Sequence, residues 1–211
     1  MSKVEAMLPQ LRFEGFSESW AHHKVVEWFT IIDGDRGVNY PKASDFKDKG
    51  HCLFLNAKNV TKTGFLFNEL SFISKEKDES MSKGKLSLND LILTTRGTVG
   101  NIALYDKKVP YENIRINSGM LILRKNKRIR DEAVSFFYQF FYSDLFYSYL
   151  ARTAFGSAQP QLTVKDIKNL CIAMPIAEEQ TKIGELFQKL DRAIELQQQK
   201  VEQSERYKKA M

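Results

Sequence analysis

The stretch Gly156-Ser157-Ala158-Gln159-Pro160-Gln161-Leu162-Thr163 is followed by a short apolar segment and then by a charged helical sequence that runs to Met211. A helix over residues 177–208 would extend about 48 Å at about 1.5 Å per residue. Seven of its residues recur at alternating steps of four and three, the spacing of a helix that packs lengthwise against another helix. These residues are Ile183, Phe187, Leu190, Ile194, Gln197, Val201 and Ser204. The pattern predicts a partner helix. A terminal helix lying on its own domain is the alternative, which suits the first turns but not the Gln-rich and Lys-rich far end.

Length and composition predict one globular domain with an extension. The 211 residues are 43% hydrophobic and 12% aromatic, enough for one substantial core but too few for two full-sized domains. We expect a mixed α/β (α+β) domain over residues 1–175 and a long helix over residues 176–211. Cys52 and Cys171 both lie in apolar runs, so we expect buried, reduced thiols in a cytosolic protein.

The charge balance is compatible with a polyanionic partner. Lysine and arginine number 32 against 26 acidic residues, which gives a net charge of +6 and a pI near 9.2. Such a balance is also common in proteins that bind no nucleic acid. No segment reads as a signal peptide or approaches the length of a membrane span, so we expect a soluble, cytoplasmic protein without membrane contact.

Apolar periodicity predicts a mixed or largely antiparallel sheet. Five apolar segments are each bounded by Gly, Asn, Asp or Lys, and they cover 52–55, 64–67, 91–95, 101–105 and 120–123. Before them, an apolar run ends at the 33–37 turn, where Gly34 and Gly37 could take positive φ and bring the backbone close to a ligand. The charged segment 75–85 is expected to be a solvated connection.

The segment 131–151 is intensely aromatic and has helical periodicity. Its rings could stack on unpaired bases. They occur on nearly all sides of one helix, however, and a helix that is apolar all round is normally buried. We therefore expect a buried aromatic helix inside the domain.

Catalytic signatures are scarce. The sequence has no phosphate-binding loop, no dinucleotide fingerprint, no zinc-ligand spacing and no methyltransferase signature. His22 and His23 are adjacent, so they cannot easily share a metal. Asp90, Asp106 and Lys108 have the spacing of the acidic and lysine set of many metal-dependent nucleases, but Asp106-Lys107-Lys108 is equally typical of a hairpin turn.

Several motifs together point to one family. They are the lead-in Leu8-Pro9-Gln10-Leu11-Arg12-Phe13-Glu14-Gly15-Phe16 with Trp20, the Gly34-Asp35-Arg36-Gly37 loop, Leu91-Ile92-Leu93-Thr94-Thr95-Arg96-Gly97-Thr98-Val99-Gly100, Gly156-Ser157-Ala158-Gln159-Pro160-Gln161-Leu162, and Pro175-Ile176-Ala177-Glu178-Glu179-Gln180-Thr181-Lys182-Ile183 leading to Leu190-Asp191. With these motifs the chain resembles the DNA specificity (S) subunit of type I restriction-modification systems. The resemblance covers one target recognition domain and one conserved spacer helix, where the family usually has two of each.

The resemblance implies a non-catalytic role in a larger complex. Such a half-length subunit would recognise double-stranded DNA, and its helix would dock methyltransferase (M) subunits that use S-adenosylmethionine. A separate restriction and motor (R) subunit would use ATP and Mg and cut the DNA, so no cofactor or metal is expected on this chain. Two copies could pair their helices head to tail as a homodimer and read an inverted repeat.

Reading base edges requires long donors and amides on rigid loops, with lysines placed on phosphates. The predicted DNA-binding residues are therefore polar residues of the candidate loops. They are Arg36, Lys42, Lys58, Asn59, Thr61, Lys62, Arg96, Thr98, Asn113, Arg115, Asn117, Ser157, Gln159 and Gln161. Arg96 and Gln159 are the strongest candidates, because glycine or proline neighbours restrict the backbone that presents them.

Two other function classes remain open at this point. The chain could be a coiled-coil interaction scaffold that binds no DNA, or an autonomous metal-dependent nuclease that uses Asp90, Asp106 and Lys108. Heparin binding without specific DNA binding would favour the scaffold, and Mg-dependent cleavage by the purified chain would favour the nuclease.

Overall fold

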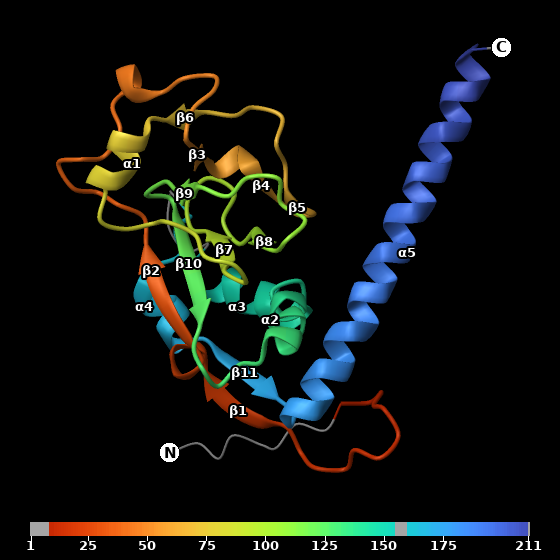
Figure 1. Ribbon diagram of the computed structural model, residues 1–211. Coiled ribbons are helices and arrows are strands. Elements are labelled where there is room, and N and C mark those ends of the chain that lie inside the picture. Colours follow the sequence, from red (N-terminus) through yellow and green to blue (C-terminus); the bar gives the residue numbers. More distant parts are fainter. Residues whose placement is uncertain (1–8, 155–159, 211) are drawn as a thin grey trace.

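The computed structural model describes residues 9–154 and 160–210. Eleven strands lie in this part of the chain, and they are β1 (Ala21–Lys24), β2 (Phe29–Asp33), β3 (Cys52–Leu55), β4 (Val60–Thr61), β5 (Gly64–Phe65), β6 (Phe72–Ile73), β7 (Leu91–Thr94), β8 (Ile102–Leu104), β9 (Ile114–Ile116), β10 (Met120–Lys125) and β11 (Cys171–Met174). The α-helices are α1 (Lys75–Ser80), α2 (Val134–Phe140), α3 (Asp144–Thr153), α4 (Val164–Asn169) and α5 (Ala177–Ala210), with short 3-10 turns η1 (Val25–Glu27), η2 (Ala43–Asp45), η3 (Ala57–Asn59) and η4 (Asp131–Ala133). The predicted α+β class is confirmed (Figure 1).

A four-stranded antiparallel sheet with the order β2-β10-β7-β8 lies at the centre of the domain. A three-stranded sheet, β6-β3-β9, lies beside it and contains the parallel pair β3 and β9. Two short antiparallel pairs, β1-β11 and β4-β5, complete the strands. The expectation of a mixed, largely antiparallel arrangement is therefore correct.

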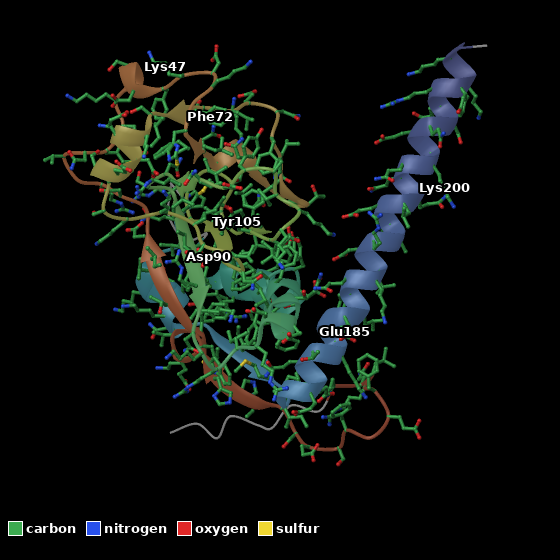
Figure 2. All side chains as sticks on the ribbon, viewed as in Figure 1. Lys47, Phe72, Asp90, Tyr105, Glu185 and Lys200 are labelled. Atoms are coloured by element: carbon green, nitrogen blue, oxygen red, sulfur yellow. The ribbon has the colours of Figure 1, made fainter. Side chains whose placement is uncertain are left out.

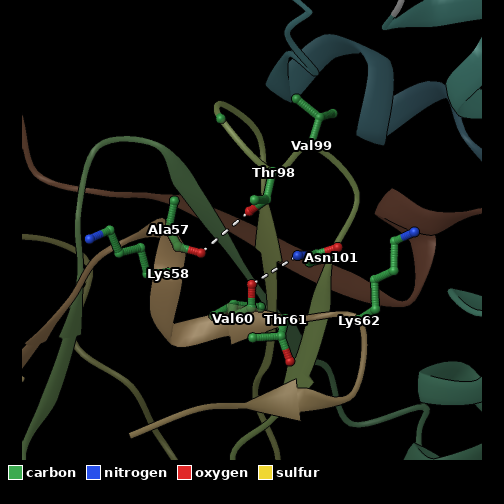
Figure 3. A pocket seen from close by; sticks show the side chains of 9 residues that line it. Ala57, Lys58, Val60, Thr61, Lys62, Thr98, Val99 and Asn101 are labelled. Atoms are coloured by element: carbon green, nitrogen blue, oxygen red, sulfur yellow. Dashed lines mark hydrogen bonds between the residues drawn. The ribbon is translucent and has the colours of Figure 1, made fainter. Parts of the chain in front are cut away.

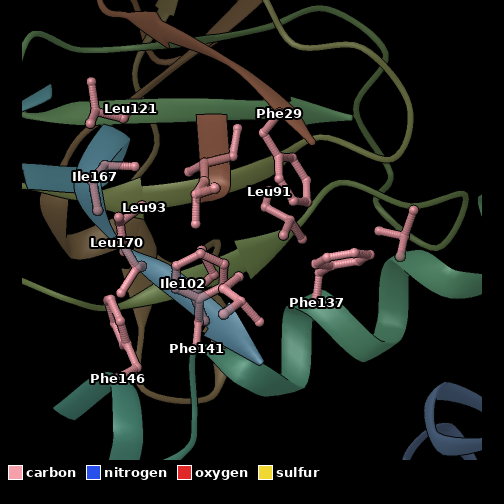
Figure 4. Close-up of a cluster of buried hydrophobic side chains, with 14 of the residues drawn as sticks. Phe29, Leu91, Leu93, Ile102, Leu121, Phe137, Phe141, Phe146, Ile167 and Leu170 are labelled. Atoms are coloured by element: carbon pink, nitrogen blue, oxygen red, sulfur yellow. The ribbon is translucent and has the colours of Figure 1, made fainter. Parts of the chain in front are cut away.

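The central sheet is buried on both faces, which explains why its strands are continuous apolar runs rather than alternating ones. Leu91 and Leu93 of β7 point into a core shared with α2, α3 and α4 (Figure 4). Ile92, between them, points into a second core with residues of β3 and β9. Successive side chains of a strand alternate between faces, so each strand serves both cores.

The aromatic segment forms two helices rather than the single helix that was predicted. The chain turns at Phe141-Tyr142-Ser143 between α2 and α3, and the Ser143 side chain accepts a hydrogen bond from Phe146 N as the N-cap of α3. Phe137, Phe141 and Phe146 are fully buried in the core (Figure 4). Phe136 is buried as well, Tyr138, Phe140, Tyr142 and Tyr149 are half-buried against the same core, and Tyr147 is exposed. The expectation that the aromatic segment packs into the domain is confirmed, but its rings are not buried on all sides.

The long helix is present as α5, which has 34 residues. Its first turns pack on α2 and η4, and its far half extends away from the domain (Figure 1). Gly184 allows the close approach to α2, since a Cβ there would lie 3.1 Å from Phe136 N. Beyond Ile183, which packs against the core, the predicted seam is exposed.

Other local expectations are wrong. Residues 75–80 form helix α1 and bury the Asp78 side chain, so the segment is not merely a solvated connection. Cys52 is buried as expected, but the Cys171 thiol is exposed at the start of β11. Gly34 does not have positive φ; it is required because a Cβ would meet Asn117 O at 2.2 Å. Gly37 also lacks positive φ.

His22 and His23 lie on strand β1, where adjacent side chains point to opposite sides. Across residues 9–154 and 160–210, no group of three or more metal-binding side chains occurs. In the same residues, no helix is both long and apolar enough to cross a membrane.

Candidate nucleic-acid interface

Strand register brings three loops to one edge of the central sheet. Asp33 at the end of β2 pairs with Leu121, and Thr94 at the end of β7 pairs with Met120. The ends of β2 and β7 therefore meet the start of β10. We call loops 34–37, 95–100 and 117–119, which continue from these ends, the rim.

The buried Asp35 carboxylate holds the first rim loop in place. Its Oδ1 accepts a hydrogen bond from Gly37 N at 2.8 Å, and its Oδ2 accepts bonds from Ser82 N and Lys83 N at 2.8 and 3.4 Å. The bond from Gly37 N, together with those from the other amides, lowers the pKa of Asp35 although burial opposes this. A carboxylate that accepts several amide hydrogen bonds is stabilised in its charged form. The loop is thus pinned to residues 82–83.

This anchoring presents Arg36 at the surface of the rim. The Arg36 guanidinium donates to Asp33 Oδ1 at 3.2 Å and to Ser118 O at 3.1 Å, which connects the first and third loops. Its side chain is 51% exposed. Nearby, Asn117 Oδ1 accepts from Gly119 N at 2.9 Å. Arg36 and Asn117, both predicted DNA-binding residues, are therefore brought together.

The middle rim loop presents Arg96 and Thr98. The Thr95 hydroxyl donates to Gly119 O at 2.9 Å, and Gly97 and Gly100 take positive φ values of 72° and 94°. Such backbone angles favour glycine. Arg96 is exposed, and within the described residues its guanidinium makes no hydrogen bond or ion pair. The late loop reaches the same place, because Leu162 N donates to Thr95 O at 3.1 Å, next to the exposed Gln161.

An open cavity of about 520 Å³ lies beside the middle rim loop (Figure 3). Thr98 Oγ1 donates to Ala57 O at 3.3 Å and Asn101 Nδ2 donates to Val60 O at 2.9 Å, which joins the loop between β7 and β8 to η3 and to β4. Polar and small side chains dominate its lining, which consists of Ala57, Lys58, Val60, Thr61, Lys62, Gly97, Thr98, Val99 and Asn101. Four predicted residues, Lys58, Thr61, Lys62 and Thr98, therefore share one surface.

Two predicted DNA-binding residues belong to the interior instead. Asn59 is 1% exposed, and its amide donates to Leu66 O and Glu69 O at 3.1 and 2.9 Å. Arg115 is 5% exposed, and its guanidinium binds Asp78 and the carbonyl oxygens of Lys83 and Met81. Neither side chain is free to reach DNA, so both predictions are wrong. Sequence position alone gave no sign that these polar residues were buried.

The remaining candidates lie away from the rim or outside the described residues. Asn113 precedes β9 and lies at the opposite end of that strand from Asn117. Lys42 precedes the short η2 turn, where its backbone N donates to Asp45. Ser157 and Gln159 fall within residues 155–159, outside the part of the chain that the structure describes.

The nuclease alternative loses its geometric basis. Asp90 lies inside the domain (Figure 2) and is 1% exposed. Arg124 donates to both of the Asp90 carboxylate oxygens, at 3.0 and 2.7 Å. Burial raises the pKa of Asp90, although Arg124 opposes the increase. Asp106 accepts a hydrogen bond from Lys108 N within a turn. These residues form an internal ion pair and a turn rather than an open metal site.

The family model for the type I restriction modification DNA specificity domain matches residues 18–206. The chain belongs to this specificity family. The match covers most of the globular part and most of α5. One family domain therefore includes both the globular part and the long helix.

Two curated relatives of this specificity-family chain carry the same description. The chain is 28% identical over 116 residues to the type I restriction enzyme EcoBI specificity subunit of Escherichia coli, covering 55% of this chain and 23% of the relative. It is 23% identical over 173 residues to a putative type I restriction enzyme MjaX specificity subunit of Methanocaldococcus jannaschii, covering 80% and 40%.

Solved structures support the fold of this specificity-family chain. The HsdS subunit from Thermoanaerobacter tengcongensis matches with a TM-score of 0.56 at 18% identity, covering 88% of this chain and 42% of that one. A type I restriction-modification S subunit from M. genitalium matches with a TM-score of 0.59 at 16% identity, covering 90% and 43%. The chain thus spans less than half the length of these relatives.

Proposed function

We propose that this chain recognises one half of a divided double-stranded DNA site and directs the catalytic subunits of a type I restriction-modification complex to it. In this proposal residues 1–175 read the DNA, and residues 176–211 form the helix for dimerisation and for docking of methyltransferase subunits. The chain acts as a half-length specificity subunit that selects the DNA site, while other subunits catalyse methylation and cleavage. Family membership supports the general role.

The observation that carries the proposal is the assembly of the rim by strand register. Arg36, Arg96 and Asn117 are far apart in sequence but stand on loops that hydrogen bonds hold to one another. Arginine binds guanine and asparagine binds adenine through paired hydrogen bonds in the major groove. Lys58 and Lys62, on the adjacent cavity, are placed to contact phosphates, which position the protein without reading sequence.

The exposed seam of α5 supports pairing with a second helix. Phe187, Leu190, Ile194 and Val201 are 39–57% exposed. They lie roughly a quarter of a turn around the helix from Gly184, which faces α2. The domain therefore does not cover this stripe, and we propose that a second copy covers it in an antiparallel pair. A symmetric dimer of this kind would read an inverted repeat.

The reactions belong to other subunits in this proposal. Methyltransferase subunits would bind the helices and use S-adenosylmethionine, and a restriction and motor subunit would use ATP and Mg. This chain contributes the orientation of those subunits on the DNA. Its own side chains bind the DNA and position those subunits on it.

The proposal is tested by binding-site selection. The purified chain would be mixed with a pool of random DNA duplexes, and bound sequences would be recovered at two salt concentrations, because phosphate contacts make affinity strongly salt-dependent. Recovery of an inverted repeat of short half-sites is the expected result. Salt-sensitive binding with no enriched sequence would contradict sequence-specific recognition and favour a scaffold.

A further inference from the structure

Two family-like motifs at opposite ends of the chain meet in an ion pair. Arg12 Nε donates to Glu179 Oε1 at 2.9 Å, and Arg12 Nη2 donates to Glu179 Oε2 at 2.7 Å. Arg12 belongs to the lead-in before β1, and Glu179 lies in the first turn of α5. Paired bonds between a planar guanidinium and a carboxylate fix geometry as well as charge.

Among residues 9–154 and 160–210, Arg12 is the residue that donates hydrogen bonds to the Glu179 carboxylate. The Glu179 side chain is 1% exposed and that of Arg12 is 12% exposed. The neighbouring Glu178 offers a direct comparison, because its pair with Arg130 is 3.7 Å long and its side chain is 60% exposed. Exposed ion pairs contribute little, whereas removing one partner of a buried pair leaves a charge without compensation. Of these two pairs, the buried Glu179 pair is the one whose paired hydrogen bonds fix the direction of the helix base.

This ion pair lies beyond the end of the β1-β11 ladder. Ala21 pairs with Met174 at the end of the ladder from which both the lead-in and α5 continue. Lys182 lies over the Phe16 ring with its Nζ 4.9 Å from the ring centroid. The lead-in therefore supports α5 at its base, in addition to the support that α2 gives.

On the α2 side, the contacts end partway along the helix. Gln188 donates to the Ser135 hydroxyl, and Gln139 donates to Asp191 Oδ2 at 3.0 Å. Within the described residues, no later residue of α5 makes a hydrogen bond or ion pair with the domain; Lys200 lies on this free part (Figure 2). The orientation of α5 is therefore set by contacts in its first half.

We infer that Arg12 and Glu179 are positioning residues that set the direction in which α5 leaves the domain, and through it the spacing between two DNA half-sites. This inference rests on the proposed dimer. From Glu179 to Ala210 the helix extends roughly 46 Å at 1.5 Å per residue. A tilt of about 4° at Glu179 would move its tip by about 3.4 Å, the length of one base-pair step. Small changes at the base therefore shift the spacing that a dimer can read.

The direction of α5 is tested without DNA by distance measurements between spin labels. Labels would be placed at Asp48→Cys and Lys200→Cys in a Cys171→Ser background, with labelled chains diluted into unlabelled ones. Glu179→Gln should broaden the distance distribution, and Glu178→Gln, the matched control, should leave it unchanged. Arg12→Lys, which keeps the charge but loses the planar fork, should give an intermediate width and also serves if Glu179→Gln does not fold. An unchanged distribution in folded Glu179→Gln and Arg12→Lys would overturn the inference.

The spacing is tested with inverted repeats that differ only in the number of base pairs between half-sites. Glu179→Gln should bind a single half-site like the unmodified chain but lose several-fold in discrimination between spacers. A broadened distance distribution with unchanged spacer preference would overturn the link to spacing, while leaving the DNA-binding function intact. If the unmodified chain binds no DNA, the proposed function fails, and the link to spacing fails with it; the distance measurement then still decides whether the ion pair holds α5.

Discussion

Arg115 and Asp78, 37 positions apart in sequence, form an ion pair inside the protein with Nε 2.5 Å from Oδ1. Burial alone would raise the pKa of Asp78, but the bonds from Lys85 and Arg115 outweigh it and lower the pKa. The same guanidinium donates to Lys83 O, and Lys83 N in turn donates to Asp35 Oδ2. The pair therefore supports the turn that holds the first rim loop.

Arg115→Ala should destabilise the fold by about 3–5 kcal/mol, because it removes one of the two cations bonded to the buried Asp78 carboxylate and also the donor to the carbonyl oxygens of Asp78, Met81 and Lys83. Lys85→Ala is the control, since Lys85 binds the same carboxylate but its side chain is 43% exposed. Lys85→Ala should lower the free energy of unfolding by at most about 1 kcal/mol. Urea denaturation of both variants measures the free energy of unfolding. Equal losses for the two variants would contradict a dominant role for the Arg115 pair.

Acid should weaken the anchoring of the rim by Asp35. The pKa of Asp35 is lowered from its usual 3.8, so its contribution to stability is present above the unfolded pKa and is lost as the pH falls through the folded pKa. Asp35→Asn cannot ionise, and its free energy of unfolding should therefore depend less steeply on pH below about 4. Denaturant titrations from neutral to acidic pH measure this slope. Parallel curves for the two proteins would show that Asp35 contributes nothing to the acid transition.

Arg96→Ala should reduce discrimination between the selected DNA site and random duplex by about 1–3 kcal/mol, the contribution of a good arginine contact to a base. Arg128→Ala is the matched control, because Arg128 is exposed in the loop after β10, at the opposite end of the sheet. It should leave discrimination unchanged. Competition binding with specific and random duplexes measures both. Equal losses on the two duplexes for Arg96→Ala would argue against direct readout.

Lys62→Ala should weaken binding to every duplex by a similar factor and reduce the salt dependence of affinity by about one phosphate contact. Lys62 lines the cavity beside the rim. Titrations at several salt concentrations give the slope. A loss confined to the selected site would show instead that Lys62 reads a base.

Leu190→Asp with Ile194→Asp should convert the proposed dimer to a monomer, because charges in a helix seam remove apolar burial on both partners. Gln199→Asp places the same charge on the opposite side of α5 and should leave the dimer intact. Light scattering after size-exclusion chromatography measures the molar mass. A dimer that survives the double substitution would place the contact elsewhere, and a monomeric unmodified chain would indicate a partner other than a second copy.

Much of the fold was accessible from local sequence patterns. Apolar runs predicted β3, β7, β8 and β10, and the four-three spacing predicted α5 nearly to its ends. The break between α2 and α3 was missed because aromatic residues continue through the turn that Ser143 caps. Strand β1 was also missed, because its sequence Ala-His-His-Lys has no apolar alternation and its pairing partner, β11, is distant in sequence.

By itself the sequence determined the main strands of the central sheet, the extended helix and the family, because propensity, periodicity and motifs are local properties. Only the tertiary structure decided which of the polar candidate residues are exposed and which are buried. Arg96 and Arg115 look equivalent in the sequence, yet one is exposed on a glycine-bounded loop and the other is buried against Asp78. The pairing of Arg12 with Glu179 likewise depends on strands β1 and β11, which bring the two ends of the chain together. Burial and long-range contact depend on how the strands pair, and local sequence does not contain that information.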